Sequence, residues 1–475
     1  MSNSEKTSIL LIDTNTSFYN LAFPVYPLGM DYLQGSLLEK GFEVQILDLA
    51  LAAGFEIENQ EKQREEKIRQ VLAKTMGGEK WDIIGVGIRN VDSTYQWNSS
   101  HDGFNYYLPT IQKYLHWINS FNREQSPIIL GGSGFSMMPE EILGFLGEDY
   151  KGLVGPGERA FPEMVKGLVE GTALKRLSSD SHPAKIGTLQ NIDLLKAYSV
   201  YSPRASIGIR TKNGCGKQCH YCPYPQISGY SPVTKPLPDI LKEIHFIRHL
   251  DGFPAFMFTD DIFNSPLDHA KQVLRAMIEE GEIPETWHAY ISPKEIDEEF
   301  VELVIESHGW NYPSQNASST ERTVIFPFDL DSGSDRMLKK MGKDFTLDDV
   351  YRALQAFERV RQRLKSVRLE KSYHFLLGYL GEDEESIRET CEFIRDTNPD
   401  KISVQVGIRI YPHTPLAQET KGILWQETQD LLKPIFIPVD RDKIIRWFVH
   451  YLPNQYILLN ESGDMATFGK ETNKK

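Results

Sequence analysis

The sequence predicts an α/β fold built twice, as two successive series of parallel strands joined by helices. Short apolar runs alternate with helical stretches on both sides of residues 171–204, a segment that mixes Gly, Ser and Pro with charged residues. Alternating strands and helices are typical of parallel sheets, and 475 residues exceed what one hydrophobic core usually serves. We therefore expect domains at 1–170 and 205–420, a linker at 171–204, and a C-terminal capping region and tail at 421–475.

The first series predicts a doubly wound, Rossmann-like domain, because its apolar runs have the length of buried parallel strands. Ligands of such sheets bind at the carboxyl ends of the strands. We expect strands at 8–13, 42–48, 81–88, 127–132 and 152–155, and helices at 29–39, 56–76, 108–121 and 158–170.

The second series predicts a partial (β/α)6 barrel, with its chemistry at the carboxyl ends of the strands. The region beyond about residue 420 lacks a regular pattern, and we expect it to cap this barrel. The expected strands are 205–210, 255–259, 287–291, 323–328, 373–377 and 402–406, and the expected helices lie near 236–250, 266–280, 294–307, 346–363 and 384–396.

Net charge and hydropathy indicate which partners and which cell compartment to expect. The formal net charge is −14, and an acidic surface repels phosphate backbones, so we expect no nucleic-acid partner. No apolar run approaches the length of a membrane span. The first residues also lack a basic region followed by an apolar stretch, which a secretory signal would have. These features predict a cytoplasmic protein.

Three of the four cysteines fall within eight residues, as Cys215, Cys219 and Cys222 in a C-x3-C-x2-C pattern. A disulfide framework would spread an even set of cysteines over a small secreted chain. Thiolates are the usual ligands of iron–sulfur clusters, and three of them leave one iron of a [4Fe–4S] cluster free to bind a small molecule. Gly214 and Gly216 would let the backbone turn tightly around such a cluster.

Zinc is the alternative occupant of this loop. A structural zinc site usually has four protein ligands. His220 lies between two of the cysteines and would have to fold back, and Cys391 lies on an expected helix, where a lone cysteine is more often a small buried hydrophobic residue. The spacing favours the cluster over zinc.

The cysteine loop after the first barrel strand, with an aromatic residue before the third cysteine, resembles that of the radical S-adenosylmethionine (SAM) superfamily. The resemblance implies that the open iron binds SAM. One electron, from a donor such as flavodoxin or ferredoxin, would then cleave SAM to a 5′-deoxyadenosyl radical. Further segments at the ends of barrel strands resemble the family's SAM-binding stretches, although Asp260 and Asp261 could instead cap the next helix and residues 332–334 could form an ordinary turn. The SAM contacts that the resemblance implies are Tyr221, Asp260, Asp261, Ser332, Ser334 and Arg409.

The first domain resembles the cobalamin-binding domain of one radical SAM subclass. The D-x-H-x-x-G motif of many cobalamin proteins is absent, so the lower face of cobalt would meet another side chain or none. Arg89 and Asn90 are the candidates, and an ion pair with a carboxylate explains Arg89 equally well. A plain Rossmann-like nucleotide domain is the competing interpretation, weakened because no G-x-G-x-x-G follows the first strand. The cobalamin contacts that the resemblance implies are Arg89, Asn90, Gly131, Gly132, Ser133, Gly155 and Glu158.

Together the two resemblances imply a cobalamin-dependent radical SAM enzyme that methylates an unactivated carbon of a small-molecule substrate. One SAM molecule would methylate cobalamin, and a second would give the radical that removes a hydrogen from the substrate. Ring rearrangement or oxidative cyclisation with the same cofactors is an alternative. A non-catalytic iron–sulfur or zinc protein is a more distant one.

Overall fold

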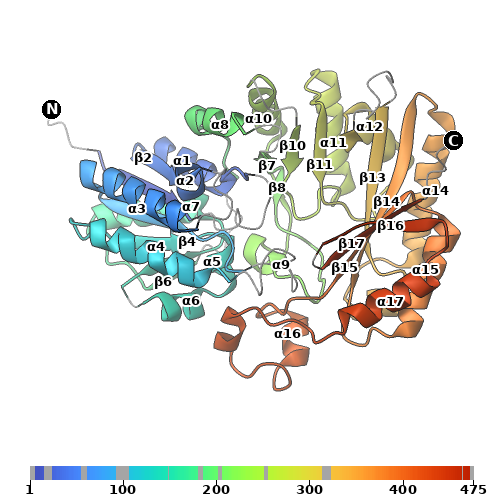
Figure 1. Ribbon diagram of the computed structural model, residues 1–475. Helices are drawn as coiled ribbons and strands as arrows, with labels where there is room; N and C mark the ends of the chain where they lie inside the picture. The colour runs from blue at the N-terminus through green and yellow to red at the C-terminus, as the bar shows by residue number, and fades with distance from the viewer. Residues whose placement is uncertain are drawn as a thin grey trace.

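Two α/β units lie side by side in the computed structural model, and a C-terminal segment runs along both (Figure 1). The structure describes residues 6–14, 24–54, 61–92, 106–147, 149–179, 186–201, 206–250, 255–312, 322–462 and 464–470.

The N-terminal unit is a parallel six-stranded sheet in the order β2-β1-β3-β4-β5-β6. The chain reverses its direction of winding between β1 and β3, which is where ligands of doubly wound sheets bind. The strands are β1 (Ser8–Asp13), β2 (Glu43–Asp48), β3 (Ile83–Gly87), β4 (Ile128–Gly131), β5 (Lys151–Val154) and β6 (Leu177–Ser179).

Helices cover both faces of this sheet because side chains alternate between its two faces. Ile9 and Leu11 pack with α1 and α7 on one face, whereas Leu10 and Ile12 pack with α3 and α4 on the other. The helices are α1 (Leu28–Glu39), α2 (Leu49–Ala53), α3 (Glu61–Gly78), α4 (Leu108–Phe121), α5 (Ser133–Met137), α6 (Pro139–Leu146) and α7 (Gly157–Val169).

The second unit is an open barrel made of two sheet segments. One has the order β11-β10-β7, and the other has the order β12-β13-β14-β15-β17-β16. Large aromatic side chains, among them Phe258, Trp287 and Phe326, fill its core. The barrel strands are β7 (Gly208–Ile209), β10 (Ala255–Phe258), β11 (Thr286–Ala289), β12 (Asn311–Tyr312), β13 (Arg322–Asp331), β14 (Val367–Leu377) and β15 (Lys401–Val406).

The helices of the barrel follow the expected alternation with the strands. They are α10 (Leu237–Arg248), α11 (Leu267–Glu279), α12 (Glu298–Glu306), α13 (Asp335–Lys340), α14 (Leu347–Arg363) and α15 (Glu384–Thr397). β7, β10, β11, β13 and β14 are each followed by one of the expected helices, α13 is an additional helix after β13, and the predicted α/β fold class is confirmed. The first residue of the predicted strand 205–210 lies outside the described residues.

Two segments that looked irregular in the sequence are ordered elements. The expected linker contains β6, which extends the first sheet, and α8 (Ile192–Ser199). The C-terminal region contains α16 (Pro415–Thr420), a 3-10 helix η2 (Thr428–Leu432), α17 (Arg441–Tyr451), β16 (Tyr456–Ser462) and β17 (Met465–Lys470). These elements show no clear hydrophobic pattern in the sequence. β6 and α8 are too short for one, and in β16 the successive side chains of Leu458 and Leu459 are both about half exposed, instead of one being buried and the next exposed.

The C-terminal region extends the barrel sheet and contacts the N-terminal unit. β17 pairs antiparallel with β15, and Leu431, Leu432 and Ile437 share a hydrophobic core with the N-terminal sheet. In the described part of the chain, no helix is both long enough and apolar enough to cross a membrane.

Candidate active site

The cysteine loop leaves the barrel after β7 and is held at both ends by backbone pairing. It starts at β8 (Lys212–Asn213), which pairs with β9 (Val233–Thr234), and it ends in the short helix α9 (Tyr224–Ser228). The N–H of Cys215 donates to Gly229 O (2.9 Å), and the N–H of Cys222 donates to Cys219 O (3.1 Å). Gly214 has φ +92°, a left-handed conformation that glycine adopts without strain.

The three cysteines of this loop form no disulfide; Cys215 is buried, and Cys219 and Cys222 are half-buried. Burial raises the pKa of all three, and that of Cys222 to about 12. Three thiolates are the ligand set that the sequence predicts for a [4Fe–4S] cluster with one open iron.

Asp260 holds the start of the loop against the neighbouring strand. Its carboxylate, only 1% exposed, accepts hydrogen bonds from the backbone N–H of Thr211 (2.8 Å) and of Lys212 (3.0 Å), and from the Thr211 hydroxyl (2.5 Å). The Lys212 ammonium lies 3.4 Å away. Asp260 does not cap the following helix, because the residue before α11 is Pro266. Its place in the structure is beneath the cysteine loop.

Asp261 lies on the other side of the same loop. It accepts a hydrogen bond from the Ser228 hydroxyl (2.5 Å), which ties β10 to α9. Its negative charge acts on both Cys215 and Cys222 and raises their pKa. The carboxylate therefore lies close to the thiols, where its half-buried side chain can meet a ligand.

Tyr221 belongs to a half-buried network with Asp331 and Lys343, neither of which was predicted from the sequence. Its hydroxyl donates to Asp331, and the ammonium of Lys343 donates to the same carboxylate (2.7 Å). The positive charge of Lys343 lowers the pKa of Cys219, against the larger effect of burial. Asp331 has a left-handed backbone (φ +61°) and is the last residue of β13. Because polar residues at the ends of barrel strands are candidates for the site, this position could have identified Asp331 from the sequence.

Ser332 and Ser334 are buried and bonded within the protein. The N–H of Ser334 donates to the Ser332 hydroxyl oxygen (3.2 Å), which is the turn that the sequence also allowed. The Ser334 hydroxyl donates to Glu389 on α15. This turn starts α13, whose far end supports the cysteine loop because Met341 O accepts from the N–H of His220 (2.9 Å).

Arg409 lies at the end of β15 and links the two units. Its guanidinium makes a double hydrogen bond to Asp92, beyond β3, at 2.5 to 3.0 Å, and the side chains of both residues are at most 2% exposed. It also donates to the carbonyl oxygens of Ile410 and Leu431. The guanidinium predicted to contact SAM is thus engaged in an ion pair between the units.

The carboxyl edge of the first sheet faces the cysteine loop, because α5 packs against α9 (Figure 1). The backbone O of Arg89 accepts from the Ser133 hydroxyl (2.9 Å). The exposed Arg89 side chain lies near enough to Asp48 and Tyr224 to lower the pKa of each, although burial has the larger, opposite effect. Gly132 has φ +99°, and a Cβ there would lie 2.6 Å from Ile88 O, so a protein contact already explains this glycine.

The remaining predicted cobalamin contacts lie along the same edge. The N–H of Gly155 donates to the Ser136 hydroxyl (3.0 Å), which links the end of β5 to α5. Asn90 follows β3, Gly131 ends β4, and Glu158 lies in the first turn of α7. The structure therefore brings these residues to one edge of the sheet.

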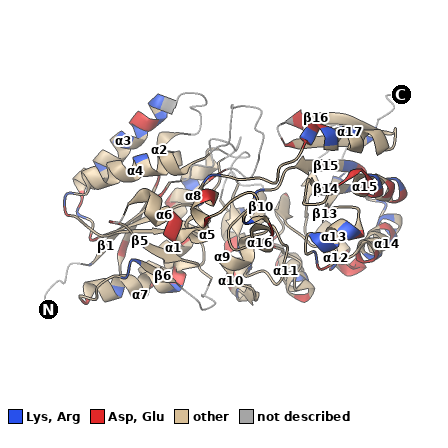
Figure 2. Cartoon of the chain, turned by 90° about the horizontal axis from the view of Figure 1, so that it is seen from below, with Lys and Arg blue, Asp and Glu red and all other residues tan. Residues whose placement is uncertain are grey.

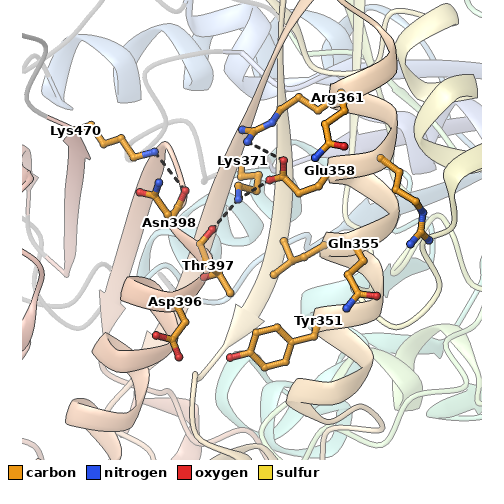
Figure 3. A pocket seen from close by; sticks show the side chains of 12 residues that line it. Tyr351, Gln355, Glu358, Arg361, Lys371, Asp396, Thr397, Asn398 and Lys470 are labelled. Atoms are coloured by element: carbon orange, nitrogen blue, oxygen red, sulfur yellow. Dashed lines mark hydrogen bonds and ion pairs between the residues drawn. The ribbon is translucent and has the colours of Figure 1, made fainter.

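A surface pocket of about 550 Å³ lies away from this site, between α14 and α15 (Figure 3). Lys371 in its wall is 4% exposed and is bonded to Thr397 O (2.7 Å) and paired with Glu358 (2.8 Å). The lining includes none of the residues predicted to bind a cofactor, and its buried cation already has partners.

Comparison with known proteins shows which family and which enzymes the chain is similar to. Residues 209–394 match the model of the radical SAM superfamily. The chain is 23% identical to a tryptophan 2-C-methyltransferase of Streptomyces laurentii, over 87% of this chain and 74% of that protein.

Two solved structures share the arrangement of both units. The radical SAM methyltransferase TsrM of Kitasatospora setae, with tryptophan and a SAM analogue bound, has a TM-score of 0.69 at 21% identity and covers 88% of this chain and 77% of that one. The cobalamin-dependent SAM radical enzyme OxsB has a TM-score of 0.62 at 15% identity and covers 96% of this chain and 60% of that one. At these identities the likeness establishes the fold.

Residues 209–394, in which the cysteine triplet follows the first barrel strand, are therefore similar to the radical SAM superfamily. The chain has the two-domain fold of TsrM and OxsB, with a doubly wound domain ahead of the barrel. Both predictions from the sequence, the superfamily and the fold, are confirmed.

Proposed function

We propose that this protein is a cobalamin-dependent radical SAM enzyme that transfers a methyl group to a carbon atom of a small molecule. One observation carries the proposal: the loop with the three cysteines lies against the carboxyl edge of a parallel doubly wound sheet, because α5 packs against α9. The names of the similar proteins support it, since two are methyltransferases and solved TsrM structures hold cobalamin, a [4Fe–4S] cluster and a SAM analogue.

The residues present fit these groups. Cys215, Cys219 and Cys222 would hold the cluster, and the edge from Arg89 to Gly155 would receive cobalamin. When bound, the cluster supplies the electron for SAM cleavage and cobalamin carries the methyl group. The protein orients the two sites, because the Arg409–Asp92 pair and the contact of α5 with α9 fix one edge against the other.

The test is a methyl-transfer assay with anaerobically reconstituted protein, cobalamin, a reductant and SAM carrying a deuterated methyl group. Tryptophan is the first substrate to try, because it is the substrate named for two of the similar proteins. We expect a corrin absorbance spectrum that survives desalting and a product heavier by the labelled methyl group. A dehydrogenated or rearranged product would support the alternative chemistry instead.

A cluster that forms normally in a protein that retains no corrin would overturn the proposal. The control is Cys219→Ala, which removes a predicted cluster ligand but leaves the first domain unchanged. This variant should retain cobalamin and transfer no methyl group. It therefore distinguishes a protein that has lost only its cluster from one that has lost its cobalamin.

We also propose where an acidic electron-transfer protein docks. Lys339 and Lys340 on α13 are exposed, and Figure 2 shows the basic residues of this helix. The far end of α13 contacts the cysteine loop at His220, and Gly216 and Gln218 of that loop are exposed beside it. A cationic patch on a protein of net charge −14 would steer an acidic donor toward the cluster.

Charge reversal separates this docking surface from the chemistry. Lys339→Glu together with Lys340→Glu should lower kcat/KM for reduced flavodoxin by at least about tenfold at low salt, yet leave turnover with dithionite unchanged. Lys365→Glu, at an exposed lysine after α14, is the matched control. Equal loss with both reductants would contradict a docking role.

A further inference from the structure

A group of metal-ligating side chains lies on the outer face of the barrel, outside the candidate active site. His245 and His249 are four residues apart at the end of α10, and Glu282 follows α11. One ligand atom from each of these residues lies within 4.8 Å of the other two. We propose that they bind a divalent transition-metal ion of the zinc type, with water completing its coordination.

The two histidines have the spacing and orientation that a metal site needs. Residues four apart on a helix share one face, and helical zinc motifs use this spacing. The two rings lie 4.0 Å apart between centroids and 32° from parallel. His249 Nδ1 lies 2.8 Å from the backbone O of His245. Since a carbonyl oxygen only accepts, Nδ1 is the protonated nitrogen, and Nε2 is left as the ligand atom, as in most metal-bound histidines.

Glu282 is held in place by groups other than the histidines. Its backbone N–H donates to Met277 O (2.8 Å), and Arg248 donates both to its carboxylate Oε2 (2.7 Å) and to Gly281 O (2.7 Å). The side chain is only 13% exposed. The carboxylate is thus fixed beside the histidine pair before any ion binds.

The contact between His245 and Glu282 indicates how an ion would enter the site. Glu282 Oε1 lies 2.6 Å from Nδ1 of His245, whose side chain is 59% exposed. With metal–ligand distances of about 2.0–2.2 Å, tetrahedral ligand atoms lie about 3.4 Å apart. A small rotation of the exposed His245 ring would open this space, and two imidazoles with one carboxylate form a ligand set that zinc accepts in proteins.

The site lies far from the chemistry. Helices of a βα barrel run antiparallel to its strands, so the end of α10 lies at the opposite edge of the barrel from the cysteine loop. A bound ion would join α10 to the turn after α11 and stabilise this part of the barrel. Its loss should therefore change thermal stability and leave SAM chemistry intact.

The experiment is a zinc titration by calorimetry and a cobalt titration by visible absorption, on tag-free, cluster-loaded protein without oxygen. We expect one saturable site and a zinc-dependent rise in Tm. His249→Ala and Glu282→Gln should weaken binding by more than the roughly 10- to 100-fold cost of losing an outer hydrogen-bond partner. His116→Ala, at an exposed histidine on α4, should bind like the unaltered protein.

Two outcomes would overturn the inference: no saturable zinc binding, or binding that survives unchanged in both His249→Ala and Glu282→Gln. The second would assign the ion to another part of the protein. Iron and sulfide contents, measured before and after each titration, exclude binding at emptied cysteines.

Discussion

At the carboxyl edge of the barrel, polar side chains are buried and bonded to the protein, whereas at the facing edge of the first sheet they are more exposed. Asp260, Ser332, Ser334 and Arg409 are each at most 3% exposed. Arg89 and Ser133 are exposed, and Asn90 and Gly155 are half-buried. The difference indicates that these four barrel residues shape the cysteine loop and the domain contact, while the half-buried Asp261 and the residues of the first sheet are available to a ligand.

Removal of a thiol should give the largest effect on the barrel side. Cys219→Ala is expected to abolish the visible charge-transfer absorbance of the reconstituted cluster, because two remaining thiolates no longer anchor it. Cys391→Ala, at a cysteine buried on α15, is the control and should keep the absorbance. If Cys219→Ala retained normal iron content, the assignment of ligands would be wrong.

The ion pair between the units should come next. Arg409→Met leaves the buried Asp92 carboxylate unpaired, and breaking such a pair costs about 3–5 kcal/mol of the free energy of unfolding. Urea denaturation measures this loss. The double variant Arg409→Met with Asp92→Leu removes both charges and should recover much of the stability. A single variant as stable as the unaltered protein would show that the pair does not hold the units together.

A smaller loss is expected beneath the cysteine loop. Asp260→Asn keeps the shape of the side chain but weakens hydrogen bonds to a charged acceptor, which are worth about 1.5–3 kcal/mol. Cluster content after reconstitution should fall together with Tm. Asp261→Asn is the neighbouring control with one hydrogen-bond donor, Ser228, and should lose less. Equal losses of cluster content and Tm in the two variants would contradict the proposed role of Asp260 in holding the cysteine loop.

At the carboxyl edge of the first sheet, a substitution should affect ligand binding more than stability. Arg89→Ala is expected to change the free energy of unfolding by no more than about 0.5 kcal/mol, as is usual for exposed positions. Corrin retention after desalting should nevertheless decrease. Unchanged corrin retention would favour the second explanation of Arg89, an ion pair with a carboxylate such as Asp48, whose pKa it affects.

The sequence predicts the repeating part of this molecule better than its connections. The strand–helix alternation and the cysteine spacing are local patterns, so both domains and the loop could be placed. The partner of Arg409 could not, because Asp92 lies 317 residues away in a segment without a motif. Lys343 was missed for the same reason, since only folding brings α13 beside the cysteine loop.

The antiparallel pairing of β17 with β15 also affects the order of events during synthesis. Until the ribosome has made β17, one side of β15 presents unpaired backbone groups, and an open strand edge invites association with other chains. The barrel therefore cannot finish folding while its C-terminal hairpin is still being translated. A variant in which β17 cannot pair with β15 should therefore aggregate more and give a lower yield than the unaltered protein.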